Sequence, residues 1–512
     1  MGYGFIIDHR RCIGCHACTT ACKSENQVAL GVFRTWVKYV EKGAFPDTRR
    51  YFTVLRCNHC DNPPCVQICP TRALFKRSNG IVDFDNSHCI GCRSCMAACP
   101  YDAIYIDPET GTAAKCHYCA HRVEIGLQPA CVVVCPEQAI LSGDLDEPGQ
   151  QIFTLRQREQ LWIRSPEKGT EPRLFYIDPD RSSLTPGEAV RSTSYLWAQT
   201  PEGGIPPAGP SFNSAIPREV YSVGHEHAWG GMVSVYLWTK SIAAGALLVS
   251  GLAAVTQFMG LSRLQSITGL AGPAIGLVFL MLTGFVLLAD LEHRERFYYI
   301  FSHPNRRSWL VWGTWILMVS GLPCLIWLGS VAFGKPPPPR SWWWGSILLA
   351  ILLAGYSALL LAQARARSWW QSPGMLPGLL LHALTAGAAA HWIVAVLAGF
   401  PLSVLYPLLK LAVLGAGAVF LACLLEILMP HANQEVSSVA RMILRGSFAR
   451  RFWIAGGLCG VVLPIALVLY ALIAESPAAE LWAGVAAATL VLAGLLVLED
   501  IWVQAGQAPP LS

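Results

Sequence analysis

Four blocks of cysteines constrain this chain more than any other feature of its sequence. Sixteen of the 19 cysteines lie before residue 136, four to a block. The blocks are Cys12, Cys15, Cys18 and Cys22; Cys57, Cys60, Cys65 and Cys69; Cys89, Cys92, Cys95 and Cys99; and Cys116, Cys119, Cys131 and Cys135. No charged-then-apolar leader or twin-arginine signal precedes them, so we expect this segment in the reducing cytoplasm. Thiols at this density then indicate metal binding rather than a disulfide scaffold.

The spacing within a block indicates the kind of metal site. Three thiolates on one tight loop can bind one iron–sulfur cubane, while the fourth, carried off on a short helix, reaches a neighbouring cluster. In the last three blocks a proline follows the fourth cysteine and ends that helix, at Pro70, Pro100 and Pro136. Zinc would require only Cys-x2-Cys pairs. The pattern therefore predicts [4Fe–4S] clusters arranged in pairs.

The second half of the chain has the composition of a membrane protein. Of all residues, 53% are hydrophobic and 14% are charged, and mean hydropathy is +0.41. Eight apolar stretches are long enough for the roughly 20 helical residues that cross a bilayer. They run over 231–259, 269–291, 309–333, 342–363, 377–399, 405–429, 453–474 and 481–503. The net charge of +5 is too small to indicate nucleic-acid binding.

The segment between these halves is polar. Residues 146–225 include the run PEGGIPPAGPSFNSAIP at 201–217, which is typical of an extended linker. We therefore expect a cysteine-rich domain over 1–145, a linker over 146–225 and a membrane domain over 226–505. Short strands are expected near 81–84 and 103–106.

Arginine and lysine in the loops predict the orientation. Ten lie on the side of the cysteine-rich domain: Arg294, Arg296, Arg306, Arg307, Arg365, Arg367, Arg441, Arg445, Arg450 and Arg451. Three lie on the other side: Arg263, Lys335 and Arg340. The cysteine-rich domain is therefore predicted to face the cytoplasm, with the helices in the inner membrane.

Two stretches within residues 1–150 carry a family resemblance. CNHCDNPPCVQICPTRAL and KCHYCAHRVEIGLQPACVVVCP resemble the four-cluster electron-transfer subunit of molybdopterin oxidoreductases, the family of dimethyl-sulfoxide, polysulfide and formate enzymes. The resemblance implies that block one pairs with block four and block two with block three. The implied ligand sets are Cys12/Cys15/Cys18/Cys135, Cys22/Cys116/Cys119/Cys131, Cys57/Cys60/Cys65/Cys99 and Cys69/Cys89/Cys92/Cys95. Lys23 replaces the proline after Cys22 and leaves the ligands intact.

The membrane half carries a second resemblance. The stretch DLEHRERFYYIFSHPNRRSWLVWGTWIL at 290–317 resembles the NrfD, or polysulfide-reductase-type, membrane subunit, which implies eight helices and a quinone site. His382 and His391 lie nine residues apart, about 180° out of phase on one helix, which disfavours a shared haem site. No haem is predicted. The expected fold is an α+β ferredoxin-like double-dicluster domain followed by an all-α eight-helix transmembrane bundle.

Ionisable residues at membrane depth are costly and indicate function. At the cluster-facing ends of the helices we select eight candidates for the quinone site: His225, His227, Tyr236, Lys240, Asp290, Arg296, His382 and Glu426. Quinone reduction consumes protons, which a carboxylate or histidine can supply. Many of these side chains fit equally well as interfacial residues or as interhelical pairs. For Lys240 we expect a pair with Asp290 or Glu426.

The favoured function is electron transfer through four [4Fe–4S] clusters between a molybdopterin-containing catalytic subunit and membrane quinone. No P-loop, Rossmann glycine pattern or nucleophile elbow gives the chain a substrate site of its own. One alternative is a subunit of a larger quinol-oxidising, proton-translocating complex linked to cytochromes. An ion transporter with ferredoxin-like regulation, which would show inverted repeats, and an inert membrane anchor are the others.

Overall fold

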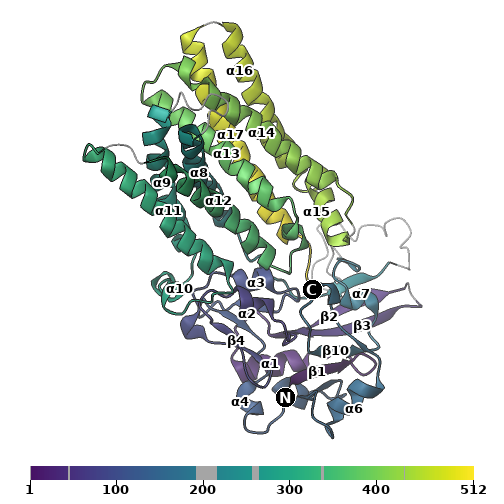
Figure 1. Cartoon of the computed structure of the whole chain (residues 1–512). Helices are drawn as coiled ribbons and strands as arrows, with labels where there is room; N and C mark the ends of the chain where they lie inside the picture. The colour runs from purple at the N-terminus through teal and green to yellow at the C-terminus, as the bar shows by residue number, and fades with distance from the viewer. Residues whose placement is uncertain are drawn as a thin grey trace.

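The two halves of the sequence form the two ends of the molecule. The computed structural model describes residues 2–43, 46–191, 216–255, 265–335, 339–431, 433–474 and 476–512. Strands and short helices gather at the end that holds the N-terminus, and long helices form the other end (Figure 1). The C-terminal residues lie where the two ends meet (Figure 1).

The N-terminal domain combines four small sheets with short helices. The larger two have the strand orders β8-β1-β10-β9 and β11-β12-β2-β3, and the hairpins β4-β5 and β6-β7 form the others. The strands are β1 (Tyr3–Asp8), β2 (Thr35–Lys42), β3 (Arg49–Arg56), β4 (Leu74–Lys76), β5 (Val82–Phe84), β6 (Ile104–Ile106), β7 (Ala113–Lys115), β8 (Ile140–Asp144), β9 (Leu161–Trp162), β10 (Leu174–Ile177), β11 (Val190–Arg191) and β12 (Arg218–Tyr221). The expected strands near 81–84 and 103–106 are confirmed as β5 and β6.

Short helices follow the cysteine loops. They are α1 (Ala17–Asn26), α2 (Pro64–Ile68), α3 (Ser94–Ala98), α4 (Ala120–Val123) and α5 (Ala130–Val133), with α6 (Gln151–Arg158) and α7 (Arg181–Leu184) at the edge of the domain. Cys69 and Cys99 come directly after α2 and α3, in extended backbone. Pro70 and Pro100 follow them, as expected from the inability of proline to continue a helix.

The expected linker over 146–225 needs correction, because much of it is folded. Strand β10 lies inside a sheet, parallel to β1, with Phe5 opposite Leu174 and Ile7 opposite Tyr176. Leu174 and Tyr176 are fully buried, so they belong to the core of the N-terminal domain. The Pro/Gly-rich run at 201–217 lies mostly outside the described residues.

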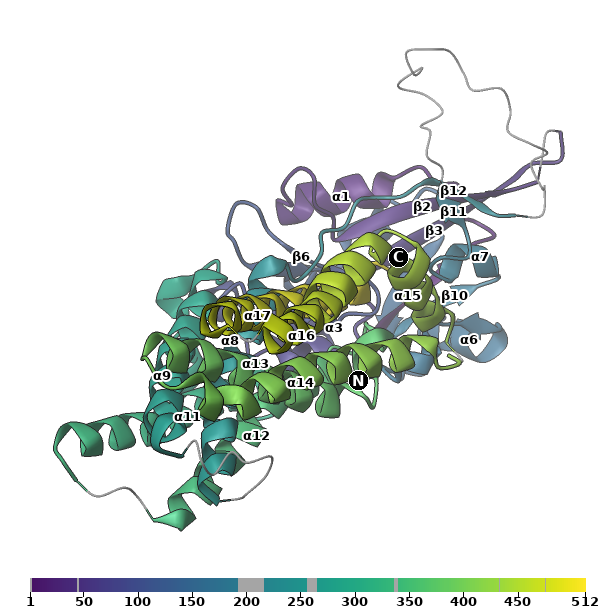
Figure 2. The ribbon, with the colours of Figure 1, turned by 90° about the horizontal axis from the view of Figure 1, so that it is seen from above.

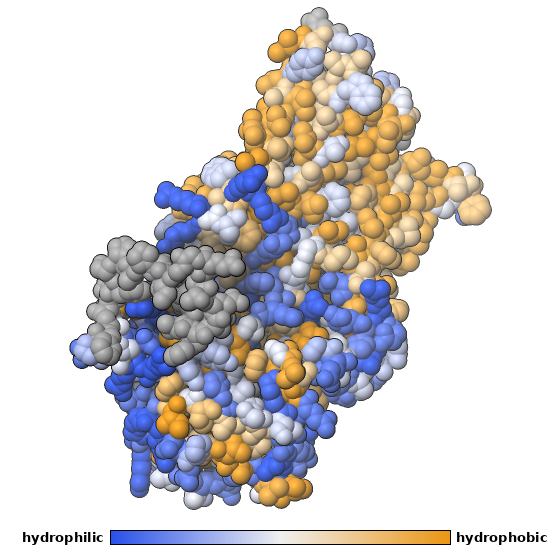
Figure 3. Space-filling view, turned by 180° about the vertical axis from the view of Figure 1, so that it is seen from behind, coloured by the Kyte–Doolittle hydropathy of each residue, from blue (hydrophilic) through white to orange (hydrophobic). Residues whose placement is uncertain are grey.

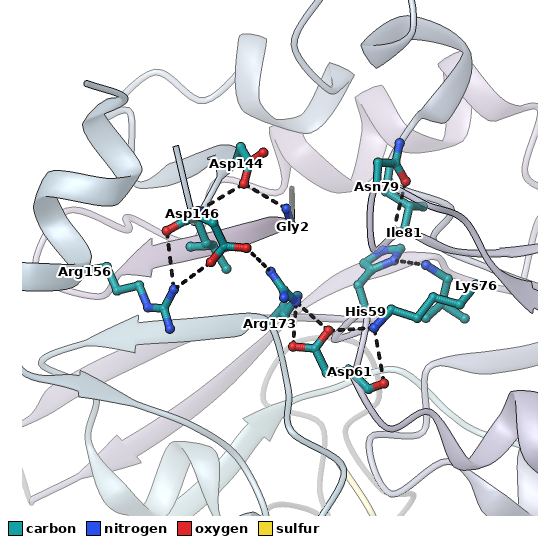
Figure 4. Close-up of polar contacts among 12 residues, drawn as sticks. Gly2, His59, Asp61, Lys76, Asn79, Ile81, Asp144, Asp146, Arg156 and Arg173 are labelled. Atoms are coloured by element: carbon teal, nitrogen blue, oxygen red, sulfur yellow. Dashed lines mark hydrogen bonds and ion pairs between the residues drawn. The ribbon is translucent and has the colours of Figure 1, made fainter. Parts of the chain in front are cut away.

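Ion pairs tie this segment to the cysteine loops. Arg173 Nε donates to both carboxylate oxygens of Asp61 at 2.7 Å, and Lys76 Nζ donates to Asp61 Oδ1 at 2.6 Å. Figure 4 shows Arg173 between Asp61 and Asp146, which in turn pairs with Arg156 on α6. Arg173 thus joins the C-terminal part of this domain to the loop that follows Cys60, while Arg156 holds Asp146 beside it.

In the part of the chain that the structure describes, eight helices are long and apolar enough to cross a membrane, as the sequence predicts. The helices are α8 (Gly231–Val255), α9 (Gln265–Ala289), α11 (Trp309–Ala332), α12 (Arg340–Gln363), α13 (Met375–Leu397), α14 (Leu402–Leu428), a π-helical stretch (Arg451–Val462) continued by α16 (Leu463–Ala474), and α17 (Pro477–Gln507). The short helices α10 (Tyr299–Ser302) and α15 (Gln434–Arg445) lie between spans. On the face that Figure 3 shows, apolar residues dominate the bundle, whereas the N-terminal domain is largely polar.

Helices α8 and α13 occupy the middle of the bundle, with α9 and α11 on one side and α14 and α16 on the other (Figure 2). Their backbones approach closely at Gly245 and Gly387, where a Cβ atom on either glycine would overlap the backbone of the opposite helix. Small residues permit this kind of contact between membrane helices. The close approach fixes how the polar side chains of α8 and α13 face one another.

Loops of the membrane domain hold the cysteine loops of the N-terminal domain. Asn305 Nδ2 donates to the carbonyl of Cys69 at 2.8 Å, and Ser308 Oγ to that of Ile68 at 2.7 Å. Arg296 Nη1 donates to the carbonyls of Asn86 at 2.9 Å and Cys89 at 3.2 Å. The second and third cysteine blocks therefore sit directly on the membrane domain.

Candidate functional site

The sixteen cysteines assemble into four groups. Three cavities in the N-terminal domain are each lined by four of them: Cys12, Cys15, Cys18 and Cys135; Cys22, Cys116, Cys119 and Cys131; and Cys69, Cys89, Cys92 and Cys95. The remaining four, Cys57, Cys60, Cys65 and Cys99, are buried and close enough for their thiols to interact electrostatically. These are the sets implied by the resemblance.

Local backbone geometry produces these groups. The residue before α1, His16, and the residue before α3, Arg93, both adopt left-handed backbone, with φ of 60° and 58°. Gly14 and Gly91, two positions earlier, do so as well, with φ of 69° and 70°. Such turns wrap three thiols around one cavity, and the helix that follows carries the fourth cysteine away. At Gly91 a Cβ atom would also overlap the side chain of Glu292 from the membrane domain.

The geometry suits iron–sulfur clusters better than zinc. A zinc ion holds its sulfur ligands at about 2.3 Å. In the part of the chain that the structure describes, no group of three or more His, Cys, Asp or Glu side chains is arranged to hold a single metal ion. Three of the four cysteine sets instead surround cavities, as an iron–sulfur cubane requires.

A buried arginine is a second observation that fits an iron–sulfur cluster between these cysteines. Arg56 has no exposed surface and lines the cavity of the Cys22 set, where its Nη1 donates to Cys131 Sγ at 3.0 Å. Its Nε and Nη2 have no hydrogen-bonding partner among the described residues. A buried cation with free donors is compatible with an anionic cluster in this cavity, since buried charges require compensation.

A larger cavity, which we call the first cavity, begins where the last cysteine set meets the membrane domain. Cys92 and Ser94 line it together with apolar side chains of α8, α9, α11 and α12. Its volume, open side included, is about 1230 Å³. Its polar lining consists of Tyr236, Asp290, Thr314 and Tyr356, besides Ser94. An apolar cavity with a few polar groups is the usual form of a site for a small organic ligand.

Two candidates from the sequence, Tyr236 and Asp290, line this cavity. The Tyr236 hydroxyl bonds Ser357 Oγ at 3.0 Å. Asp290 follows the end of α9, and burial raises the pKa of its carboxyl, although Arg93 opposes this effect. A carboxyl group with a raised pKa at the edge of a ligand cavity is suited to exchange protons.

Lys240 lies one turn further along α8 and is fully buried. Its ammonium donates to the carbonyl of Ala354 at 3.0 Å and to Ser357 Oγ at 2.8 Å. The expected ion pair with Asp290 or Glu426 is therefore wrong, because the groups that hydrogen-bond to Lys240 are a carbonyl and a hydroxyl of α12. Through Ser357, Lys240 is linked to Tyr236.

The other candidates lie elsewhere. His382 and Glu426 line a second cavity, between α13, α14 and α17. His225 lies 3.6 Å from Asp102 and against Trp36 of the N-terminal domain, His227 is exposed, and Arg296 bonds the Cys89 loop. These last three line neither cavity and lie where the two domains meet; their contact with quinone stays a prediction.

Family models match both halves of the chain. The model described as "4Fe-4S binding domain" matches residues 10–28, and "4Fe-4S dicluster domain" matches residues 48–145. The model described as "Polysulphide reductase, NrfD" matches residues 220–509, which is more than half of the sequence. The protein belongs to the NrfD family. It joins an iron–sulfur electron-transfer domain to a multi-pass NrfD membrane domain in one polypeptide.

Curated relatives of this NrfD protein match it over a little more than a third of its length. It is 46% identical over 201 residues to a subunit of the tetrathionate reductase of Salmonella typhimurium, covering 38% of this chain and 80% of the relative. It is 41% identical over 194 residues to a subunit of the polysulfide reductase of Wolinella succinogenes, covering 36% and 97%. It is 41% identical over 178 residues to protein NrfC of Escherichia coli, covering 34% and 80%.

Sequence reasoning missed several residues of this NrfD protein's cavities. Ser357 links Lys240 to Tyr236, and Tyr356 and Thr314 line the first cavity. All three are uncharged and lie within apolar helices, so they give no signal of their own. Tyr356 and Ser357 lie more than 100 residues after Tyr236 in the sequence, and they come close to it only because α12 packs against α8.

Proposed function

We propose that the chain carries electrons through four [4Fe–4S] clusters between a molybdopterin-containing catalytic subunit and membrane quinone. The observation that supports this most is Cys92, which belongs to one four-cysteine set and also lines the first cavity of the membrane domain. When bound, the clusters supply one-electron transfer, and quinone accepts two electrons and two protons.

The four ligand sets form a continuous series. Cys18 of one set is close enough to interact with Cys131 of the next. Cys116 in turn neighbours Cys57, and Cys65 neighbours Cys95, in the set that reaches the membrane. This proximity supports a path along the sets that contain Cys12, Cys22, Cys57 and Cys89, in that order.

The outer end of the series suits a catalytic partner. Cys15 is exposed, as are its neighbour Ile13 (55%) and, further along, Leu30 (90%). The relatives are subunits of tetrathionate and polysulfide reductases by name, which supports an oxidoreductase partner. We assign the molybdopterin-containing subunit to this face, and the arginine-rich loops support a cytoplasmic location for it.

The first cavity is the proposed quinone site. Tyr236 and Asp290 would hydrogen-bond the oxygens of the headgroup, while the apolar helices exclude water and accommodate the tail. Cys92 and Ser94 lie at the same cavity, so the headgroup would sit next to the last cysteine set. Tyr236 is itself held in place by Ser357.

A cavity-filling substitution tests this assignment. Thr314→Trp, on α11, places an indole in the first cavity, whereas Val319→Trp alters an exposed position of the same helix. In the full-length, cluster-loaded chain reduced with dithionite, Thr314→Trp should lower the rate of cluster reoxidation by a short-chain benzoquinone at least 10-fold. Val319→Trp should leave it unchanged. Equal reoxidation rates for Thr314→Trp and the native chain, at equal iron content, would show that the first cavity is not the quinone site.

A further inference from the structure

The second cavity of the membrane domain lies next to the first. Residues of α13, α14, α17 and the turn Ser368–Gln371 line it, and its volume, open side included, is about 1760 Å³. Leu237 and Leu361 line both cavities, so only a thin wall separates them. No cysteine of the four sets lines the second cavity. It is therefore not a second point of entry for electrons.

Buried polar atoms converge on this second cavity without partners. Of the described residues that line it, six have a buried side-chain nitrogen or oxygen that forms no hydrogen bond. They are Trp369 Nε1, His382 Nδ1, Glu426 Oε1, His431 Nε2, Glu499 Oε2 and Trp502 Nε1. Each such atom costs free energy unless a ligand or water satisfies it. His382 Nδ1 has an ion contact with Glu499 Oε1 at 3.3 Å, and the other five atoms around one cavity indicate a hydrated site.

A line of polar side chains leads from this cavity to the first one. His382 Nδ1 lies 3.3 Å from Glu499 Oε1, which accepts a hydrogen bond from Ser241 Oγ at 3.1 Å. Lys240, next to Ser241 on α8, hydrogen-bonds to α12 rather than to Ser241 or Glu499, but it lies close enough to Glu499 for their charges to interact.

From Lys240 the line continues to the quinone cavity. Lys240 Nζ donates to Ser357 Oγ at 2.8 Å, and Ser357 Oγ bonds the Tyr236 hydroxyl at 3.0 Å. Tyr236 lines the first cavity. The line thus crosses the wall between the two cavities.

We propose that the second cavity is a hydrated proton port that exchanges protons with the quinone cavity through Glu499, Lys240, Ser357 and Tyr236. The inference rests on the proposed function, because it requires quinone chemistry in the first cavity. Ser368 and His431 line this cavity, and Ser368 accepts a hydrogen bond from Lys168 of the iron–sulfur domain, so we place the mouth of the port on that side. Protons would therefore enter from the same side as the electrons.

The proton balance of such a port is simple. Reduction of one quinone takes two electrons, which arrive through the iron–sulfur domain, and two protons, which the relay supplies one at a time. Tyr236 gives its proton to a quinone oxygen and takes the hydroxyl proton of Ser357, which in turn takes one from the Lys240 ammonium. Neutral Lys240 then takes a proton from Glu499, whose charge acts on it. Water in the second cavity reprotonates Glu499.

Charged groups on each neighbouring helix face this relay. Lys240 of α8 and His382 of α13 flank Glu499 on α17, and Glu426 of α14 and His431 line the same cavity. The adjacent carboxylate on α17 is directed elsewhere: Asp500 pairs with Arg451 and accepts from Ser234 Oγ. Glu499 is therefore the carboxylate of α17 that serves the cavity.

A pair of substitutions in α17 tests the port. Glu499→Gln removes the proton of the relay and retains a hydrogen-bonding side chain, while Glu480→Gln alters a carboxylate at the far end of the same helix. We would reduce the cluster-loaded full-length chain with dithionite, add a short-chain benzoquinone and record proton uptake with a pH-indicating dye. Glu499→Gln should slow proton uptake by about 10²-fold, the range that a lost proton-transfer group produces. Iron content and quinone affinity should not change, and Glu480→Gln should match the native chain.

Two further measurements cover misfolding and failure of the proposed function. Lys240→Met should slow proton uptake as Glu499→Gln does, and the native chain should show an infrared carboxyl band that changes on quinone reduction. Native proton uptake in both variants, or no carboxyl change in the native chain, would overturn the port. If the native chain reduces quinone but neither the slowed proton uptake nor the carboxyl change is seen, the port is excluded and the proposed function is not. If the native chain does not reduce quinone, the proposed function and the port fail together.

Discussion

Two fully buried cations illustrate how single residues serve the electron path. Arg56 lies among the thiols of the second cysteine set, with two guanidinium nitrogens free of protein partners among the described residues. Lys240 lies in the membrane domain and donates to a carbonyl and a hydroxyl. Burial of an unpaired charge is costly. In both places we infer that the buried cation is compensated by the group that the neighbouring cavity would hold.

Removal of Arg56 should change a reduction potential. A positive charge beside a cluster stabilises its reduced, more negative form, so Arg56→Met should lower the potential of the cluster in the Cys22 set. The expected shift is roughly 59 mV, which corresponds to a tenfold change in a one-electron equilibrium. Redox titration followed by electron paramagnetic resonance measures it. Arg181→Met, at an exposed arginine, is the control, and equal potentials in the two variants would contradict this role of Arg56.

At the scale of elements, the segment after residue 145 completes the N-terminal domain. Strand β10 lies between β1 and β9, and α7 packs beside β2 and β3. Asp180 caps α7 by accepting from the Ser182 amide at 2.9 Å, and it pairs with Lys42 on β2 at 2.7 Å. One side chain therefore holds both the helix and its contact with the sheet.

Asp180→Ala should destabilise the iron–sulfur domain by about 1–2 kcal/mol, from the lost cap and a partly exposed ion pair. Burial alone would raise the pKa of Asp180, but Lys42 and Ser182 bring it below its ordinary value. Its contribution is thus present above the unfolded-state pKa of about 3.9 and is lost as pH falls through the lower folded-state pKa. The loss should be constant across neutral pH. Chemical denaturation followed by cluster absorbance measures the destabilisation, with Arg181→Ala as the control. A denaturation midpoint of Asp180→Ala equal to that of the native chain would contradict the prediction.

The close approach of α8 and α13 gives a second prediction for elements. Gly387→Ala should weaken this packing by about 1–3 kcal/mol, because its Cβ would overlap the backbone at Gly245. Gly378→Ala, in the same helix, meets no atom within 4 Å and should be neutral or stabilising. Thermal unfolding in detergent compares the two variants. Equal stability of the two variants would mean that the backbones of α8 and α13 do not approach this closely at Gly245 and Gly387.

The sequence predicts elements that have local signals and misses those that depend on distant partners. The eight spans and the strands β5 and β6 follow from apolar runs, and the cysteine sets follow from spacing together with the family resemblance. Strand β10 contributes only Leu174–Ile177, and its partner β1 lies about 170 residues earlier in the chain. Its place in the sheet was therefore not visible. For the same reason Ser357, a neutral hydroxyl in an apolar helix, gave no sign of bonding Lys240.

At the scale of the whole molecule, the arrangement is a series of four cysteine sets that begins at an exposed face and ends at a membrane cavity. The membrane domain holds the last sets directly, through Asn305 and Arg296. Because both parts belong to one polypeptide, the distance between the last set and the cavity is fixed by packing. If the first cavity binds quinone, as we propose, electron exchange between the last set and quinone needs no docking step between subunits.

The number of quinones reduced by one fully reduced molecule tests this account most directly. The full-length protein would be reduced anaerobically, freed of excess reductant and mixed with a short-chain benzoquinone, and the quinol formed would be counted against protein. Four one-electron clusters connected to a two-electron acceptor predict two quinols per protein molecule. Clusters that stay reduced while quinone remains oxidised would contradict the central claim.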